Sequence, residues 1–262
     1  MGNIIIVSLL IGGIGLLIGL LLGFAQQKLA VEIDEREVAI RECLPGNNCG
    51  GCGYPGCDGL ANAIVEGKAP TNACPVGGSE CANKIAAIMG TEAEETPEKM
   101  VAYVHCIGDC EHAIKNYQYY GVQDCTMMGY IPDGGNKRCN DGCLGYGSCV
   151  KACPYEAISI VNGIAVVDKE KCKACGKCLK VCPKNLITLV PYNAIAHISC
   201  TSSQKGKLVM DACKNGCISC TKCVRTCPND AIVMRGNIPT IDYRICTNCG
   251  TCISACPRKC IK

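Results

Sequence analysis

The longest apolar stretch of the chain lies near its start. Residues 4–25 contain no charged side chain and consist mostly of Ile, Leu and Gly. A helix of this length spans the hydrocarbon core of a bilayer, so the pattern predicts one transmembrane helix in a membrane anchor at residues 1–28. The alternative is a cleaved signal peptide that ends at Gly23-Phe24-Ala25. The length of the run and the lack of a basic segment before it favour the anchor.

Shorter patterns predict small helices and strands after the anchor. Leu60 and Ile64 recur at helical spacing in residues 59–67, and a second helix is expected near residues 80–89. Residues 91–98 have no apolar periodicity and contain a proline, which is typical of an exposed linker. Alternating apolar positions in the C-terminal half predict two small pairs of antiparallel strands. The alternating apolar positions are Ile164, Val166 and Val167 in the first pair of strands, and Ile238 and Ile241 in the second.

The composition limits how such elements can be stabilised. The 262 residues include 28 Cys, a single Phe and no Trp, so an ordinary apolar core would be thin. Many cysteines are too close in sequence to pair efficiently in disulfides. Zinc ribbons use pairs of C-x2-C rather than the triplets found here. The pattern therefore favours metal clusters whose binding stabilises the fold.

The first cysteine group supplies a complete ligand set for one [4Fe-4S] cluster. Its four thiols have the order C-x2-C-x4-C-x16-C, with glycines that let the backbone approach a cluster closely. Two more cysteines nearby, Cys43 and Cys81, are expected to be small buried apolar residues. The predicted ligands are Cys49, Cys52, Cys57 and Cys74.

Three perfect C-x2-C-x2-C-x3-C-P runs follow in the second half. This is the run of bacterial ferredoxins, in which the fourth cysteine binds the other cluster of a pair. A fourth run is degenerate, because Tyr146 occupies the position of its second cysteine. Adding 74 to the positions of this run and the next one gives the positions of the last two runs. The chain is therefore predicted to contain two ferredoxin units in tandem, at residues 137–198 and 199–262.

Crossed ligation within each unit predicts four further [4Fe-4S] clusters. In the degenerate run the fourth ligand is missing, and Cys139 is its expected substitute; a three-iron cluster or an exchanged ligand is the alternative. The predicted sets are Cys217, Cys220, Cys223 and Cys256; Cys227, Cys246, Cys249 and Cys252; Cys153, Cys172, Cys175 and Cys178; and Cys139, Cys143, Cys149 and Cys182.

Five clusters leave a group of cysteines that suggests a sixth. Two of these cysteines precede the first ferredoxin unit and two precede the last two runs, so they form a candidate site between the units, with Cys110 as a rival ligand. The candidate ligands are Cys106, Cys125, Cys200 and Cys213.

The combined motifs define an α+β protein with an N-terminal transmembrane helix, a small cluster-binding domain and tandem di-cluster ferredoxin units. The cluster-binding domain is expected at residues 29–90, and residues 91–136 form an acidic linker and connecting segment. The order of helix, CGGCG-x-PGC segment and ferredoxin repeats resembles the B subunit of Rnf ion-translocating electron-transport complexes, in the long version of anaerobes.

The resemblance implies a role in a membrane redox pump. Complexes of this family oxidise reduced ferredoxin, reduce NAD and move Na+ or H+, and this subunit would admit electrons from soluble ferredoxin. Other membrane and peripheral subunits would be partners, and flavins and the NAD site would belong to them. The second ferredoxin unit departs from the shorter family pattern and leaves the order of electron flow open.

The residues themselves agree with an electron carrier that has no catalytic site of its own. No dinucleotide-binding glycine motif, P-loop or nucleophile pattern occurs, and neither zinc nor nucleic acid is expected. His105, His112 and His197 are expected at the surface or in loops. The alternatives are an electron-wiring subunit of a membrane hydrogenase or formate dehydrogenase, and an iron–sulfur sensor or scaffold. Cluster-binding thiols favour a cytoplasmic location for the iron–sulfur domains at the cell membrane.

Charge suggests where an acidic ferredoxin docks. Residues 137–262 contain 19 Lys and Arg against 7 Asp and Glu, whereas residues 1–136 contain 7 against 16. Six lysines crowd around one cysteine triplet and are predicted to steer ferredoxin to it, unless they form only a solvated surface. They are Lys169, Lys171, Lys173, Lys177, Lys180 and Lys184.

Overall fold

The computed structural model describes residues 2–29, 34–92 and 98–262. Its first element is the helix α1 (Gly2–Leu29), which contains the apolar run. The described apolar side chains of this helix are exposed, from 50% for Ile18 to 71% for Leu9. Among the described residues, no helix has both the length and the apolarity needed to cross a membrane. The expected transmembrane helix therefore stays a prediction.

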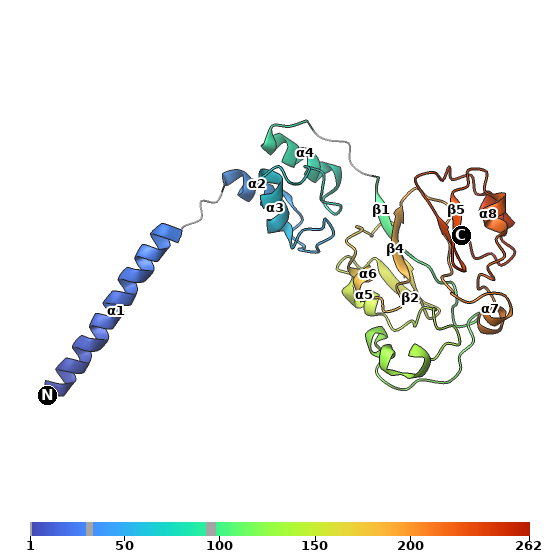
Figure 1. The fold of residues 1–262 in the computed structure, drawn as a ribbon, viewed down its shortest axis with the longest axis horizontal. Coiled ribbons are helices and arrows are strands. Elements are labelled where there is room, and N and C mark those ends of the chain that lie inside the picture. Colours follow the sequence, from blue (N-terminus) through green and yellow to red (C-terminus); the bar gives the residue numbers. More distant parts are fainter. Residues whose placement is uncertain (1, 30–33, 93–97) are drawn as a thin grey trace.

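Three helices form the small domain that follows: α2 (Glu35–Cys43), α3 (Cys57–Val65) and α4 (Gly78–Met89). They lie together in Figure 1, and their shared core is built on Ile40, Leu60, Ile64 and Ile85, each at most 2% exposed. The helices expected near residues 59–67 and 80–89 are thus confirmed as α3 and α4. The apolar pattern did not indicate α2, because only Ile40 of its nine residues is buried.

The two ferredoxin units contain matching hairpins and short helices. In the first unit, β2 (Ile158–Val161) pairs with β3 (Ile164–Val167), and α5 (Ser148–Ala152) packs against α6 (Lys177–Val181). In the second, β5 (Ile232–Arg235) pairs with β6 (Ile238–Ile241), and α8 (Lys222–Thr226) packs against α9 (Thr251–Ala255). Both hairpins are antiparallel, as the alternating apolar positions predicted.

The repeat of 74 residues also holds at the level of single hydrogen bonds. The backbone N–H of Asp168 donates to the carbonyl of Ala157 at 2.8 Å, and Asp242 donates to Ala231 at the same distance. Each hydrogen bond closes the hairpin of its own unit, just before the next cysteine triplet. The two units therefore fold by the same local rules.

A strand outside these hairpins extends the first unit. The strand β1 (Met100–Val104) pairs antiparallel with β4 (Ile187–Pro191), so that Val101 faces Val190 in the register; both are buried. It lies in the segment that the sequence pattern assigned to a connection. Residues 93–97 of the expected acidic linker lie outside the described residues.

Three short elements complete the described fold. Two are 3-10 helices, η1 (Cys125–Tyr130) and η2 (Pro132–Gly134), in the loop before the first unit. The third is the helix α7 (Lys207–Ala212), which lies in the second unit before its first cysteine run. Figure 1 shows α7 below β5 and α8 in this view.

Candidate iron–sulfur sites

The first group of thiols surrounds the start of α3. Burial raises the pKa of the Cys74 thiol, and the Cys52 and Cys57 thiols nearby raise it further. Backbone N–H groups point at this group, since Gly77 donates to the Cys74 sulfur at 3.4 Å. We call the predicted set Cys49, Cys52, Cys57 and Cys74 the Cys49 site.

The two spare cysteines of this domain lie close to that site. Cys81 is buried, and its thiol donates to the Cys43 carbonyl at 3.2 Å. A Cβ added to Gly77 would lie 2.7 Å from the Cys81 sulfur and 3.5 Å from the Cys74 sulfur. The absence of a side chain at Gly77 therefore lets both sulfurs pack against the same turn.

The second group lies in the first ferredoxin unit. Burial and, to a lesser degree, its neighbours Cys172, Cys175 and Cys153 raise the pKa of the Cys178 thiol to about 12. The backbone N–H of Ala102 in β1 donates to the Cys172 sulfur at 3.3 Å. The strand β1 thus supplies a donor to a predicted cluster ligand. We call the set Cys153, Cys172, Cys175 and Cys178 the Cys172 site.

The first two sites meet at a close contact between the small domain and the first ferredoxin unit. A Cβ built on Gly51 would lie only 3.2 Å from the Cys175 carbonyl oxygen. Nearby, the Asn47 side-chain amide donates to the Tyr155 hydroxyl at 2.5 Å. The Cys49 thiol is among the groups that raise the pKa of Cys175, after burial. The glycine-rich loop of residues 49–53 therefore covers the Cys172 site at Cys175.

The thiols of the degenerate run lie around a cavity with a different cysteine from the expected one. Cys143, Cys149 and Cys182 line one cavity with Cys125, whereas Cys139 lines a separate cavity. Burial and, to a lesser degree, the thiols of Cys143, Cys125 and Cys182 raise the pKa of Cys149 to about 11. The expectation that Cys139 joins this set therefore disagrees with the arrangement of the thiols. We call the group Cys125, Cys143, Cys149 and Cys182 the Cys143 site.

Local hydrogen bonds explain why Cys125 reaches this cavity. The Asp124 carboxylate caps η1 by accepting from the Thr126 N–H at 2.8 Å, and it also accepts from the Ser148 hydroxyl at 2.9 Å. The Ser148 oxygen in turn accepts from the backbone N–H of Cys125 at 2.9 Å. The loop is thereby tied to the start of α5, beside Cys149.

Cys139 lies instead in a site between the two units. One cavity is lined by Cys106, Cys139, Cys200 and Cys213. The backbones of Cys106 and Cys200 pair there in an isolated antiparallel β-bridge. Three of the four candidate ligands of a sixth cluster line this cavity together with Cys139, whereas Cys125 lines the cavity of the degenerate run. We call this group the Cys106 site. Cys110, the rival ligand, is exposed and does not line the cavity.

The second ferredoxin unit contains two cavities lined by the sets that crossed ligation predicts. One is lined by Cys217, Cys220, Cys223 and Cys256, and the other by Cys227, Cys246, Cys249 and Cys252. We call them the Cys217 site and the Cys246 site. A fifth thiol, Cys260, also lines the first cavity, with its sulfur 3.4 Å from that of Cys256.

The grouping of the thiols fits clusters better than single metal ions. Within residues 34–92 and 98–262, no three His, Cys, Asp or Glu side chains converge closely enough to hold one metal ion. A [4Fe-4S] cube is bound differently, because each of four cysteines binds its own iron at a separate corner. Thiols that surround a cavity, with backbone N–H groups directed at their sulfurs, match this geometry.

One of the three histidines is buried. His197 is 3% exposed and packs between Tyr103 and Tyr243, with ring centroids 4.3 Å and 5.9 Å away. Burial and, to a lesser degree, the charge of Lys169 lower the pKa of His197 to about 4. His197 therefore lies in a loop, as expected, but its side chain is buried in the contact between the units.

Three segments match models of iron–sulfur families. Residues 44–76 match a putative Fe-S cluster family, residues 139–193 match the LdpA Fe-S cluster-binding domain, and residues 216–260 match a 4Fe-4S dicluster domain. With the thiol cavities, these matches define an iron–sulfur electron-transfer protein with several [4Fe-4S] clusters.

Similarity over nearly the whole chain identifies the family. The chain is 46% identical to the B subunit of the Na(+)-translocating ferredoxin:NAD(+) oxidoreductase complex of Acetobacterium woodii, over 96% of its length and 75% of the relative's. It is 40% identical to the B subunit of the proton-translocating complex of Clostridium ljungdahlii, over 100% of its length and 93% of the relative's. It is 39% identical to the B subunit of the ion-translocating oxidoreductase complex of Methanosarcina acetivorans, over 100% of its length and 99% of the relative's. The chain belongs to this family of ion-translocating ferredoxin:NAD(+) oxidoreductase subunits, which confirms the resemblance.

Proposed function

We propose that this chain takes electrons from reduced ferredoxin and passes them, through six [4Fe-4S] clusters, towards NAD-reducing partner subunits. The observation that carries the proposal is the continuous order of the thiol sites. The Cys49 site touches the Cys172 site through Gly51, and Cys149 of the Cys143 site is among the groups that raise the pKa of Cys178 in the Cys172 site. One-electron transfer along such a row requires no substrate pocket.

The Cys106 site joins the two halves of the row. The N–H of Cys143 donates to the Cys106 sulfur at 3.3 Å, and the N–H of Cys217 donates to the Cys200 sulfur at 3.3 Å. Each ferredoxin unit therefore contacts the middle site through the first cysteine of its own first run. This arrangement supports a sixth cluster there, held by Cys106, Cys139, Cys200 and Cys213.

The ends of the row suggest a direction. The Cys49 site follows α1 in the chain, whereas Cys220 and Cys249 in the last two sites are exposed. We place electron entry at the second ferredoxin unit and exit at the small domain. The basic residues Lys222 and Arg225, which lie in α8 beside the Cys217 site, would attract an acidic ferredoxin.

The lysines around the Cys172 triplet are the competing docking surface. Lys169, Lys171 and Lys173 are exposed, but the triplet is covered at Cys175 by the glycine-rich loop. Reversing the charge at Lys222 and Arg225 should slow electron entry in a manner that depends on salt, since steering is screened by ions. The matched control reverses Lys169, Lys171 and Lys173. A larger effect in the control would move entry to the first unit.

The same proposal assigns α1 to a membrane anchor that holds the iron–sulfur domains at the cytoplasmic face. The support is the uncharged run at residues 4–25 and the tendency of cluster-binding thiols to stay in reducing compartments. No carboxylate lies in this run, so ion movement would belong to partner subunits. Extraction of the chain from membranes by alkaline carbonate would contradict the anchor.

Iron counting with redox titration tests the electron-carrier function. The detergent-solubilised full chain, prepared without oxygen, should contain about twenty-four irons and as many sulfides, at four per cluster. EPR-monitored titration should show several coupled low-potential signals. About twenty irons would remove the middle cluster from the proposal. Zinc, or fewer than about twelve irons after reconstitution, would overturn electron transfer as the function.

A further inference from the structure

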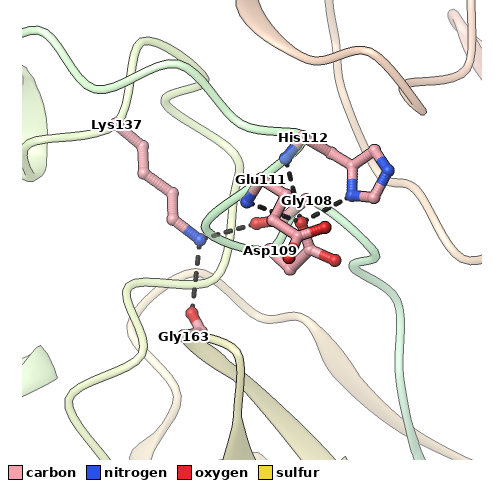
Figure 2. A network of polar contacts seen from close by, with 6 residues as sticks. All are labelled: Gly108, Asp109, Glu111, His112, Lys137 and Gly163. Atoms are coloured by element: carbon pink, nitrogen blue, oxygen red, sulfur yellow. Dashed lines mark hydrogen bonds and ion pairs between the residues drawn. The ribbon is translucent and has the colours of Figure 1, made fainter.

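Lys137 is a buried lysine in the wall of the Cys106 site. Lys137 is 4% exposed, and it lines the same cavity as the four cysteines of the Cys106 site. The ammonium group donates to the Gly108 carbonyl at 2.7 Å and to the Gly163 carbonyl at 3.3 Å (Figure 2). Gly163 lies between β2 and β3, so the side chain reaches from the middle site into the hairpin of the first unit.

No carboxylate of the described residues lies within 4.0 Å of the Lys137 ammonium. Asp109 is close in the chain to one of the carbonyl partners, but its carboxylate is turned to His112, with Oδ1 2.6 Å from Nδ1 (Figure 2). Asp141, in the wall of the same cavity, accepts from Ser203 instead. Burying an ammonium with only neutral partners is costly, so a negative group is expected nearby.

A cluster in the Cys106 site would supply that negative charge. Four thiolates around a 2+ core carry about −2 in the oxidised state and about −3 after one electron arrives. The Gly108 carbonyl that holds the ammonium lies against this site, because a Cβ built on Gly108 would be 3.3 Å from the Cys213 sulfur and 3.8 Å from the Cys106 sulfur. The ammonium is therefore held beside two ligands of the middle site.

We propose that Lys137 is the buried counter-charge of the Cys106 site and raises the reduction potential of its cluster. An ammonium that is little screened by water stabilises the reduced state more than the oxidised one, because the reduced cluster carries one more negative charge. Lys137 thereby favours the transfer of one electron from a reduced cluster of the second unit, which is oxidised in the step. No proton or other group is transferred. The inference rests on the proposed sixth cluster.

The chain offers a matched control for this charge. The backbones of Lys115 and Lys137 form an antiparallel bridge, but the Lys115 side chain is exposed. Lys137→Gln removes the buried charge and keeps a hydrogen-bond donor for the carbonyls, whereas Lys137→Arg keeps the charge. Lys115→Gln removes a charge at the same bridge on the solvent side.

The readout is the midpoint potential of the middle cluster in the anaerobic full chain, followed by EPR. That cluster is identified as the signal lost in Cys213→Ser. We expect Lys137→Gln to shift this midpoint to a lower potential, and Lys137→Arg and Lys115→Gln to leave it near the wild-type value. An unchanged midpoint in Lys137→Gln would overturn the inference and leave the proposed function standing.

Iron content separates the remaining outcomes. If Lys137→Gln loses about four irons but Lys137→Arg retains them, the charge is needed to hold the cluster, and the counter-charge role is supported. Loss of iron in both variants would mean that Lys137 serves packing, and the inference would fail. If Cys213→Ser contains as much iron as the wild type, the middle cluster does not exist. The sixth cluster of the proposed function and the role of Lys137 would then fail together.

Discussion

The backbone N–H of Cys143 donates to the sulfur of Cys106 at 3.3 Å, and this contact joins the first ferredoxin unit to the site between the units. The second unit makes a similar contact with a donor 74 residues later, where the backbone N–H of Cys217 donates to the Cys200 sulfur at 3.3 Å. A donor directed at a cluster ligand stabilises the negative charge on its sulfur. The middle site is thus approached in the same way from both sides.

The first prediction is that electrons cannot cross between the units without the middle site. In Cys106→Ala, the clusters of the second unit should still be reduced by ferredoxin, while those of the first unit should stay oxidised. Freeze-quench EPR after mixing with reduced ferredoxin measures both. The control Cys110→Ala changes an exposed cysteine outside the cavity and should behave as the wild type. Normal reduction of the first unit in Cys106→Ala would disprove a route through this site.

The second prediction concerns the exchanged ligands Cys125 and Cys139. Two changes in one cluster should cost no more iron than either alone, whereas changes in two clusters should add. We therefore expect Cys125→Ser with Cys149→Ser to lose about four irons, and Cys125→Ser with Cys213→Ser to lose about eight. The opposite pattern would return Cys139 to the Cys143 site.

The places of Cys125 and Cys139 show what the sequence alone did not reveal. Cys139 precedes Cys143 by four residues and therefore looked like the substitute ligand, but Cys125 arrives from a loop that hydrogen bonds to Ser148 hold in place. Spacing along the chain does not reveal such a loop. One signal was available: adding 74 to Cys139 gives Cys213, so the two should occupy equivalent positions in a site between the repeats.

Elements held by local contacts could be predicted from the sequence, whereas contacts between distant segments could not. The hairpins and the helices α3 and α4 follow from short apolar patterns, because their partners are close in the sequence. The pairing of β1 with β4 joins segments about ninety residues apart, and a five-residue strand does not specify its partner. Burial of His197 likewise depends on Tyr103 in β1, which the sequence alone did not place.

The third prediction concerns the contact between the small domain and the first unit. Gly51→Val should push the glycine-rich loop away from the Cys175 carbonyl, at a cost to docking of about 1–3 kcal/mol. Electron transfer from the Cys172 site to the Cys49 site should slow several-fold, while iron content stays the same. Gly129→Val is the control, because a Cβ at Gly129 meets no atom within 4 Å. Equal rates in the two variants would mean that this contact does not set the distance between the clusters.

The last prediction is a pH dependence at the contact between the units. His197 has a pKa of about 4 in the folded chain against 6.5 when unperturbed, because burial disfavours its charged form. Its Nδ1 lies 2.9 Å from the Tyr243 hydroxyl, and its buried Nε2 has no hydrogen-bond partner in the structure. The lowered pKa means that the unfolded chain binds more protons between these values, so stability is full above pH 6.5 and falls towards pH 4.

The loss should be roughly 3 kcal/mol over that range, at about 1.4 kcal/mol per pKa unit. It should appear first at the chain end, where His197 and Lys262 exchange backbone hydrogen bonds of 2.6 and 3.0 Å. Amide hydrogen exchange of these two residues, corrected for intrinsic rates, measures the local opening. In His197→Gln the opening free energy should no longer change with pH in this window, whereas His112→Gln, at a partly exposed histidine, should keep the wild-type slope. The same slope in His197→Gln and the wild type would assign the acid sensitivity to another group.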